Sequence, residues 1–242
     1  MKALSKTELA VMNSRSVYHN RVKSVMDGMG KTEKLLKKST NVKLGKKVTK
    51  GKWKGFPIYT LTLEERATCP MSCAHWGDCY GNNMMFATRY QVGPEFEAML
   101  QVELSDLQNK HPNGFLVRLH ILGDFYSVSY VAKWAMWLGQ FPALHIYGYT
   151  ANQPNATDAT ERSLGQAIQT LRDNCAERFQ VRFSGNFDYA TMTANSADDV
   201  RALAAVEAKQ AFICPVQQDR VSDCGACGLC WSSKKPVVFI TH

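Results

Sequence analysis

The stretch F-L-V-R-L-H-I-L-G-D, residues 115–124, decides the fold class, because it is a short apolar run that stops at a glycine and an acid. Residues Phe115–Ile121 predict a strand, since apolar runs bounded by turn residues are typical of buried parallel sheets. The pattern recurs at Leu144–Tyr149, which is followed by Thr150-Ala-Asn152, and at Phe179–Phe183. This repetition indicates parallel strands whose carboxyl ends carry polar residues.

Predicted helices separate these strands. Apolar residues at helical spacing follow Pro94, Ser127 and Ser196, and they recur around Leu164–Leu171. Further strands are expected at Ile58–Leu63, Ala211–Ile213 and Val237–Ile240. Strands that alternate with helices predict an α/β fold, here a partial parallel β/α barrel of about six strands with right-handed crossovers.

Seven of the eight cysteines fall into two tight groups. The first group is Cys69-x3-Cys73-x5-Cys79, and the second is Cys214-Pro215 followed by Cys224-x2-Cys227-x2-Cys230. Thiolates two or three residues apart can converge on one metal centre. A consecutive C-x2-C-x2-C run is typical of a 4Fe–4S cluster, and bacterial ferredoxins also place a proline directly after a ligating cysteine. We therefore predict that both groups bind metal, with one or two 4Fe–4S clusters favoured over zinc.

Zinc stays an alternative metal at both groups. At the first group, His75 could complete a Cys3His set for zinc. Three cysteines without a fourth ligand favour instead a cluster with one open iron. Cys175 lies on the apolar face of a predicted helix and is expected in the core. Its alternative role is that of the missing fourth ligand.

Cysteines and polar residues also follow the ends of the predicted strands. Cys69, Gly123-Asp124, Thr150-Ala-Asn152 and Cys214 each come after one. In parallel α/β folds the chemistry lies at the carboxyl ends of the strands. We expect these residues to meet on one rim, where Gly123, Asp124, Thr150 and Asn152 bind a ligand. Asp124 has an alternative role as a helix cap.

Positive charge gathers near the N-terminus. Residues 1–54 hold 15 of the 29 Lys and Arg residues but only 3 of the 21 Asp and Glu residues. The chain is therefore divided into a basic N-terminal arm, 1–55, and an iron–sulfur β/α domain, 56–242. A capping-box pattern at Ser5–Glu8 should start a helix, and the lysine-rich stretch that ends at Lys54 is expected to be extended or weakly ordered. Residues 1–54 are expected to contact nucleic acid, with a solvated tail as the alternative.

Neither a membrane nor secretion is expected. No apolar run approaches the ~20 residues that a membrane-spanning helix needs. The N-terminus has no apolar stretch of the kind that a secretion signal requires. Eight cysteines in an unsecreted chain argue for metal or redox chemistry rather than disulfides. A cytoplasmic location is therefore expected.

The order of these features resembles the core of the radical S-adenosylmethionine superfamily. A cysteine triad follows the first predicted strand, a glycine–acid step the second, and Thr-x-Asn the third. The resemblance implies a 4Fe–4S cluster on the first three cysteines, with a fourth iron that chelates S-adenosylmethionine. It also implies that Gly123-Asp124 helps to hold the amino group of this ligand, and that the C-terminal cysteines hold an auxiliary cluster. The usual loop of the superfamily is C-x3-C-x2-C, whereas the second gap here is five residues.

The sequence is also similar to the phage- and plasmid-encoded gene product 88 family. The shared motifs are L-T-L-E-E-R-A-T-C-P-M-S-C, L-G-D-F-Y-S, G-Y-T and C-G-A-C-G-L-C-W. This resemblance covers most of residues 56–242 and implies no particular activity. Two hypotheses follow. One is an iron–sulfur protein with a radical-type core that acts on or near nucleic acid. The other is a non-catalytic iron–sulfur or zinc protein that binds nucleic acid or senses redox state.

Overall fold

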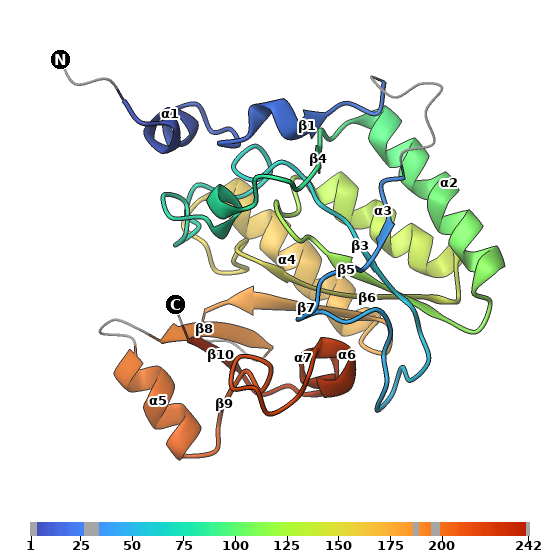
Figure 1. The fold of residues 1–242 in the computed structure, drawn as a ribbon, viewed down its shortest axis with the longest axis vertical. Helices are drawn as coiled ribbons and strands as arrows, with labels where there is room; N and C mark the ends of the chain where they lie inside the picture. The colour runs from blue at the N-terminus through green and yellow to red at the C-terminus, as the bar shows by residue number, and fades with distance from the viewer. Residues whose placement is uncertain (1–3, 27–33, 186–188, 195–198, 241–242) are drawn as a thin grey trace.

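The computed structural model describes residues 4–26, 34–185, 189–194 and 199–240. Its centre is an eight-stranded sheet in the order β2-β3-β5-β6-β7-β8-β10-β9 (Figure 1). The strands are β2 Lys37–Lys38, β3 Ile58–Thr60, β5 Phe115–Leu119, β6 Leu144–Thr150, β7 Phe179–Ser184, β8 Ala190–Ala194, β9 Phe212–Ile213 and β10 Val237–Ile240. In this described part of the chain, every neighbouring pair is parallel except β2–β3. The α/β class and the mostly parallel sheet are therefore confirmed.

The sheet is open, with β2 and β9 at its two edges. The strands predicted from apolar runs are all present, and β2 and β8 join them. The last two strands do not follow chain order, because β10 pairs with β8 on one side and with β9 on the other. This exchange moves β9, and the cysteine that follows it, to the outer edge of the sheet.

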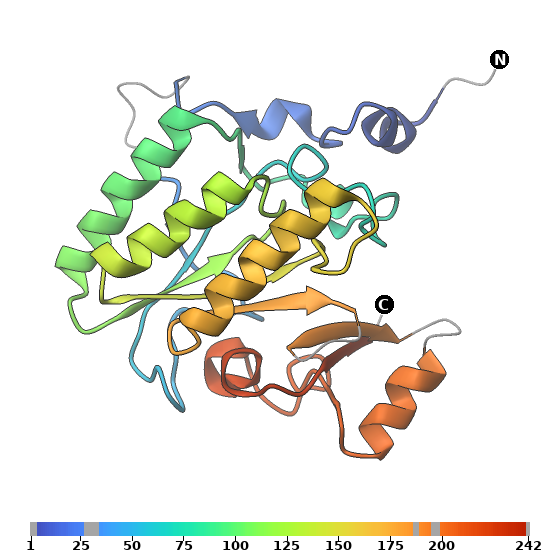
Figure 2. The same cartoon turned by 180° about the vertical axis from the view of Figure 1, so that it is seen from behind.

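Three long helices cover one face of the sheet (Figures 1 and 2). They are α2 Pro94–Lys110, α3 Val128–Gln140 and α4 Ala159–Asn174. Proline occupies the first turn of α2. The Ser127 side chain accepts a hydrogen bond from the Tyr130 amide at 3.1 Å, so Ser127 caps the N-terminus of α3. Trp134 and Trp137 on α3 are fully buried in the apolar cluster between helices and sheet. Both tryptophans are therefore packing residues, as their helical spacing indicated.

The lysine-rich segment packs against the other face of the sheet. Leu44, Val48 and Trp53 are buried there, and the Trp53 ring stacks on that of Trp231 with centroids 5.6 Å apart. The Thr49 amide donates a hydrogen bond to the backbone oxygen of Gly225, and the Cys224 amide donates one to that of Lys43, both at 2.9 Å. Residues 34–55 are thus part of the folded body, and the expectation of an extended or weakly ordered stretch was wrong for them. Apolar side chains spaced irregularly among the lysines cause this packing.

Shorter elements complete the described chain. They are α1 Lys6–Met12, the 3-10 turns His19–Arg21 and Tyr80–Asn83, the parallel pair β1 Val22–Lys23 with β4 Arg89–Tyr90, and the helices α5 Asp199–Glu207, α6 Cys224–Cys227 and α7 Leu229–Ser232. The predicted capping box of α1 is confirmed, since Ser5 and Glu8 exchange side-chain-to-backbone hydrogen bonds. The predicted cap Ser196 lies outside the described residues. None of the helices described is both long enough and apolar enough to cross a membrane.

Candidate metal and cofactor sites

A buried ion pair organises the loop that carries the first three cysteines. The Arg89 guanidinium donates to both carboxylate oxygens of Glu65, with a Nε–Oε2 distance of 2.8 Å, and the two side chains are 0% and 1% exposed. Arg89 also donates to the backbone oxygens of Gly81, Met84 and Ala87. A buried pair of this kind is rigid because each polar atom has a partner. The end of the loop is therefore fixed to the segment that follows β3.

A second arginine fixes the middle of the same loop. Arg66 Nε donates to the backbone oxygen of Trp76 at 3.0 Å, and its Nη2 donates to the Asn82 side-chain oxygen at 2.8 Å. The sequence motif L-E-E-R before Cys69 thus supplies the side chains that shape the cysteine loop. Sequence reasoning missed this role. The available signal was a run of charged residues directly after a predicted strand.

The thiols of Cys69 and Cys73 lie within the electrostatic reach of Asp124 and of Cys79. Burial, followed by the negative charge of Asp124, raises the pKa of the Cys69 thiol well above its ordinary value, and the charges of Cys73 and Cys79 act in the same direction. Burial also raises the pKa of Cys73, again with Asp124 and Cys79 as contributors. A bound cation would remove these penalties, because thiolates are the metal-binding form of cysteine. The electrostatic coupling places these thiols near one another, in surroundings that disfavour free thiolates.

Asp124, Thr150 and Asn152 meet in one buried network at the carboxyl ends of β5 and β6. Asp124 Oδ1 accepts hydrogen bonds from the Phe125 amide and from Thr150 Oγ1, and its Oδ2 accepts one from the Ala151 amide at 2.7 Å. The Asn152 side-chain amide donates to Thr150 Oγ1 at 3.2 Å. Burial raises the pKa of Asp124 to about 6, although these hydrogen bonds oppose the rise.

The neighbouring backbone explains why a glycine precedes Asp124. Gly123 has a φ of +79°, and a Cβ there would lie 2.6 Å from Leu63 Cβ and from Thr68 Oγ1. Thr68 Oγ1 accepts a hydrogen bond from the Asp124 amide and donates one to the backbone oxygen of Glu64. The close approach joins the end of β5 to the cysteine loop. The helix-cap alternative for Asp124 is wrong, because Ser127 caps α3.

The two other candidate ligands of the first site have different surroundings. His75 is half-exposed, with its Nδ1 3.3 Å from the Asp78 carboxylate at the surface. Cys175 ends α4 and packs against the apolar cluster under the helices, as expected of a core residue.

The four C-terminal cysteines line one hollow. Cys214 follows β9, while Cys224, Cys227 and Cys230 lie on the short helices α6 and α7, and all four line the same small hollow. Gly228, with a φ of +71°, allows α6 to pass directly into α7. Burial, followed by the charges of Cys230 and Cys214, raises the pKa of the Cys224 thiol to about 12. The predicted set of four is therefore assembled around a common space.

Two sheet residues hold this second group from below. Arg182 on β7 is fully buried and donates to the backbone oxygens of Cys230, Ser233 and Lys235 at 2.7–3.1 Å. Tyr149 on β6 donates its hydroxyl hydrogen to Cys230 Sγ at 3.0 Å. Sequence reasoning missed both residues. The only signal for Arg182 was a charged residue inside an apolar strand pattern.

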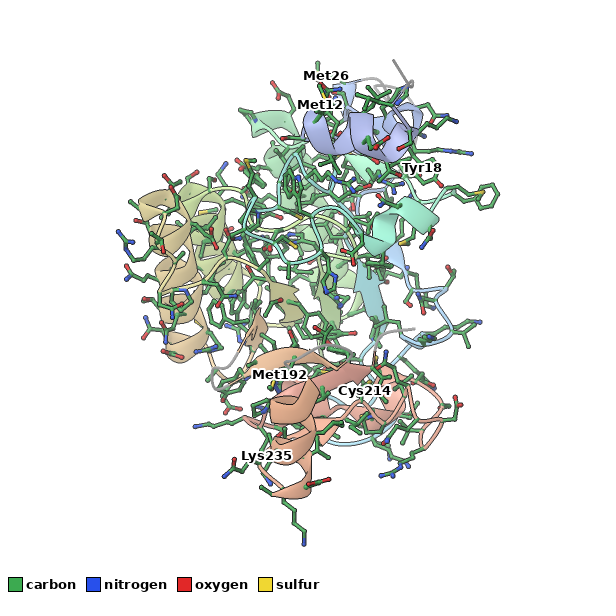
Figure 3. The ribbon with its side chains drawn as sticks, turned by 90° about the vertical axis from the view of Figure 1, so that its left-hand side faces the viewer. Met12, Tyr18, Met26, Met192, Cys214 and Lys235 are labelled. Atoms are coloured by element: carbon green, nitrogen blue, oxygen red, sulfur yellow. The ribbon has the colours of Figure 1, made fainter. Side chains whose placement is uncertain are left out.

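The two cysteine groups form separate sites. Cys69, Asp124, Thr150 and Asn152 meet as expected, but Cys214 lies with the C-terminal cysteines because β9 is displaced to the sheet edge. Figure 3 shows Cys214 among the C-terminal strands, far from Tyr18, whose hydroxyl donates to the backbone oxygen of Asn82 in the first cysteine loop. Among the residues described, no group of three or more His, Cys, Asp and Glu side chains has the arrangement of a single metal-ion site.

An open, mostly parallel α/β sheet that carries two groups of cysteines defines the class of this protein. The family model described as gene product 88 matches residues 33–233, so the chain belongs to the gene product 88 family. The matched range begins before the buried lysine-rich segment. The gene 88 protein of Mycobacterium phage L5 is 29% identical over 139 residues, which cover 52% of this chain and 54% of that protein. The chain thus spans about half the length of this curated relative. No solved structure matches the chain.

Proposed function

We propose that this protein is an iron–sulfur protein with two unlike clusters. The observation that carries the proposal is that Cys214, Cys224, Cys227 and Cys230 line one hollow. Four thiolates complete the ligand set of a 4Fe–4S cluster, so this site has no vacancy for a substrate. When bound, such a cluster supplies or accepts one electron. A reducing compartment such as the cytoplasm suits free thiols of this kind.

The first site is proposed to hold a cluster with one open iron. Its three thiols, of Cys69, Cys73 and Cys79, leave a fourth position unfilled, and Asp124 is the carboxylate whose charge acts on Cys69 and Cys73. The ligand class we propose is a small chelator with an ammonium group, for which S-adenosylmethionine is the probe. Asp124 Oδ2 would accept a hydrogen bond from the ammonium group and orient it. In this proposal the open sheet is a partial β/α barrel, and the site lies at its carboxyl rim.

Electron paramagnetic resonance of the reduced, anaerobically purified protein tests the open iron. Adding S-adenosylmethionine should change the signal of one cluster and leave the other unchanged. Asp124→Asn should keep both clusters and weaken the response, because the side chain keeps its shape and loses its charge. Ser127→Ala is the matched control, since it alters the α3 cap and not the carboxylate. A wild-type signal that the ligand leaves unchanged contradicts an open iron.

A second candidate function, contact with nucleic acid, is favoured by the surface of residues 34–54. Nine lysines of this segment are exposed while Leu44, Val48 and Trp53 are buried, and the segment contains no Asp or Glu. A folded surface with this charge can neutralise phosphates and release counterions. The chain would then carry its clusters on or near DNA or RNA.

Lysine substitutions test this second function better than deletion, because removal of residues 1–54 also removes the buried Trp53. We expect Lys46→Gln, Lys47→Gln and Lys50→Gln together to weaken binding of single-stranded DNA. The slope of log affinity against log salt should fall by about 2. A control with Lys110, Lys209 and Lys234 changed to Gln removes the same charge from exposed positions elsewhere. Equal loss in both variants would mean that general charge, and not this surface, governs binding.

A further inference from the structure

Tyr149 connects the central sheet to the C-terminal cysteines. Its hydroxyl donates to Cys230 Sγ at 3.0 Å, and its ring stands edge-on to Phe239 of β10 with centroids 5.8 Å apart. The ring is held in place between neighbouring strands, so the direction of the hydroxyl group is fixed. A thiolate ligand at Cys230 would accept this hydrogen bond. Tyr149 therefore supplies a polar contact to a cluster ligand from outside the ligand set.

Arg118 on β5 brings a positive charge to the same place. Its guanidinium carbon lies 4.5 Å from the centroid of the Tyr149 ring and 5.4 Å from that of Tyr147. Its hydrogen bonds run to the backbone oxygens of Leu119 and His120. Within the described residues, no carboxylate forms a salt bridge with this guanidinium. The charge is therefore available to act on the thiolates above the sheet.

The charge of Arg118 acts on the four-cysteine site. Burial raises the pKa of Cys224, and the positive charge of Arg118 opposes that rise.

We infer that Tyr149 and Arg118 raise the reduction potential of the C-terminal cluster. This inference rests on the proposed function, because it needs a cluster on Cys230 and its partners. Reduction adds one negative charge to the cluster. A hydrogen bond to a ligating sulfur and a nearby cation both stabilise the more negative state, so each favours the reduced form. Tyr149 and Arg118 are positioning residues, since neither occupies a ligand position.

A potentiometric titration with dithionite as the electron donor tests the role of Tyr149. The cluster signal of the wild type is compared with that of Tyr149→Phe. We expect the ratio of oxidised to reduced cluster at a given potential to rise about tenfold, which is about 59 mV for a one-electron couple. Tyr59→Phe is the matched control: Tyr59 is a buried tyrosine whose hydroxyl lies 2.9 Å from His111 Nε2, and its loss should leave the midpoint unchanged.

Arg118 variants keep the inference testable if Tyr149→Phe does not fold. Arg118→Gln should lower the midpoint as well, and Arg118→Lys should restore most of the wild-type value because it keeps the charge. A midpoint that is unchanged in Tyr149→Phe and in Arg118→Gln, in proteins that retain their iron, overturns the inference and leaves the proposed function standing. Wild-type protein that binds no iron overturns the proposed function instead.

Discussion

The two cysteine sites of this protein differ in the number of cysteines and in the side chains that support them. The first has three cysteines on a long loop at the carboxyl ends of β5 and β6, and the supporting side chains are charged: Glu65, Arg89 and Asp124. The second has Cys214 after β9 and three cysteines on the short helices α6 and α7, and it is supported by Arg182 and by the aromatic stack of Trp53 on Trp231. If both sites hold clusters, the complete set of four cysteines needs only side chains that fix its position. The incomplete set of three cysteines also needs a neighbouring group that holds the ligand in the remaining position.

The largest loss of stability should come from removing the buried ion pair that supports the first site. Arg89→Met leaves the Glu65 carboxylate buried without its partner, and three backbone oxygens lose a donor. Breaking a buried pair in this way costs about 3–5 kcal/mol. Urea unfolding followed by tryptophan fluorescence measures the loss. The exposed Lys110→Met is a control that should stay within about 0.5 kcal/mol of wild type. A loss below about 1 kcal/mol for Arg89→Met would mean that the pair does not hold the loop.

The stability of the second site should depend on Trp53, which is far from the C-terminal cysteines in sequence. Trp53 is 2% exposed and stacks on Trp231, next to Cys230. Trp53→Ala should lower the free energy of unfolding by about 3 kcal/mol. It should also reduce iron at the C-terminal site while the response of the first site to S-adenosylmethionine survives. If Trp53→Ala removes iron equally from both sites, the residues that support the two sites do not act independently.

Acid should destabilise the protein at the carboxyl end of β5, beside the first site. His120 precedes Gly123-Asp124, its Nε2 lies 3.2 Å from the Tyr130 hydroxyl, and burial lowers its pKa to about 3. Since this value is below the ordinary 6.5, the stability that depends on neutral His120 is present above pH 6.5 and is lost as the pH falls toward 3. At pH 5 the expected loss is about 2 kcal/mol.

The pH dependence of unfolding in His120→Gln measures this effect. The variant should lose less stability between pH 7 and 5 than the wild type does. His19→Gln, at an exposed position, should follow the wild-type curve. Parallel curves for all three proteins would show that His120 does not set the acid response.

The smallest predicted effect distinguishes the role of the Asp124 carboxylate from that of the neighbouring helix α3. Ser127→Ala removes the side-chain acceptor at the start of α3 and should cost about 1 kcal/mol. The response of the first site to S-adenosylmethionine should be unaffected. Loss of that response in Ser127→Ala would mean that the position of α3, rather than the charge of Asp124, controls the ligand.

Strands and cysteine groups were predictable because their signals are local. Apolar runs marked β5, β6 and β7, and two polar residues at the carboxyl ends of β5 and β6, Asp124 and Thr150, do meet. β2 was missed because its two lysines carry no strand signal. The buried Glu103 of α2 accepts hydrogen bonds from the amides of Leu35 and Leu36 at 2.8 Å, which fixes the chain just before β2. Long-range contacts of this kind leave no periodic pattern in the sequence.

The supporting residues of both sites were missed for the same reason. Arg182 reaches the backbone of Cys230 across 48 residues, and Tyr149 reaches the Cys230 sulfur across 81. Cys214 was correctly grouped with the C-terminal cysteines, but it does not meet Asp124 as expected, because chain order suggested that β9 precedes β10 in the sheet. The pairing of β10 with β8 reverses that order. Sequence spacing identified the two cysteine groups, and the strand order decided which residues lie beside each of them.

Iron and acid-labile sulfide per chain, measured with zinc on anaerobically purified protein, test the central claim most directly. The wild type should contain about eight irons for two 4Fe–4S clusters and little zinc. Cys227→Ala should lose about half of this iron, and Cys175→Ala, which changes a core thiol outside both groups, should lose none. Stoichiometric zinc without sulfide in the wild type, or unchanged iron in Cys227→Ala, would contradict the account.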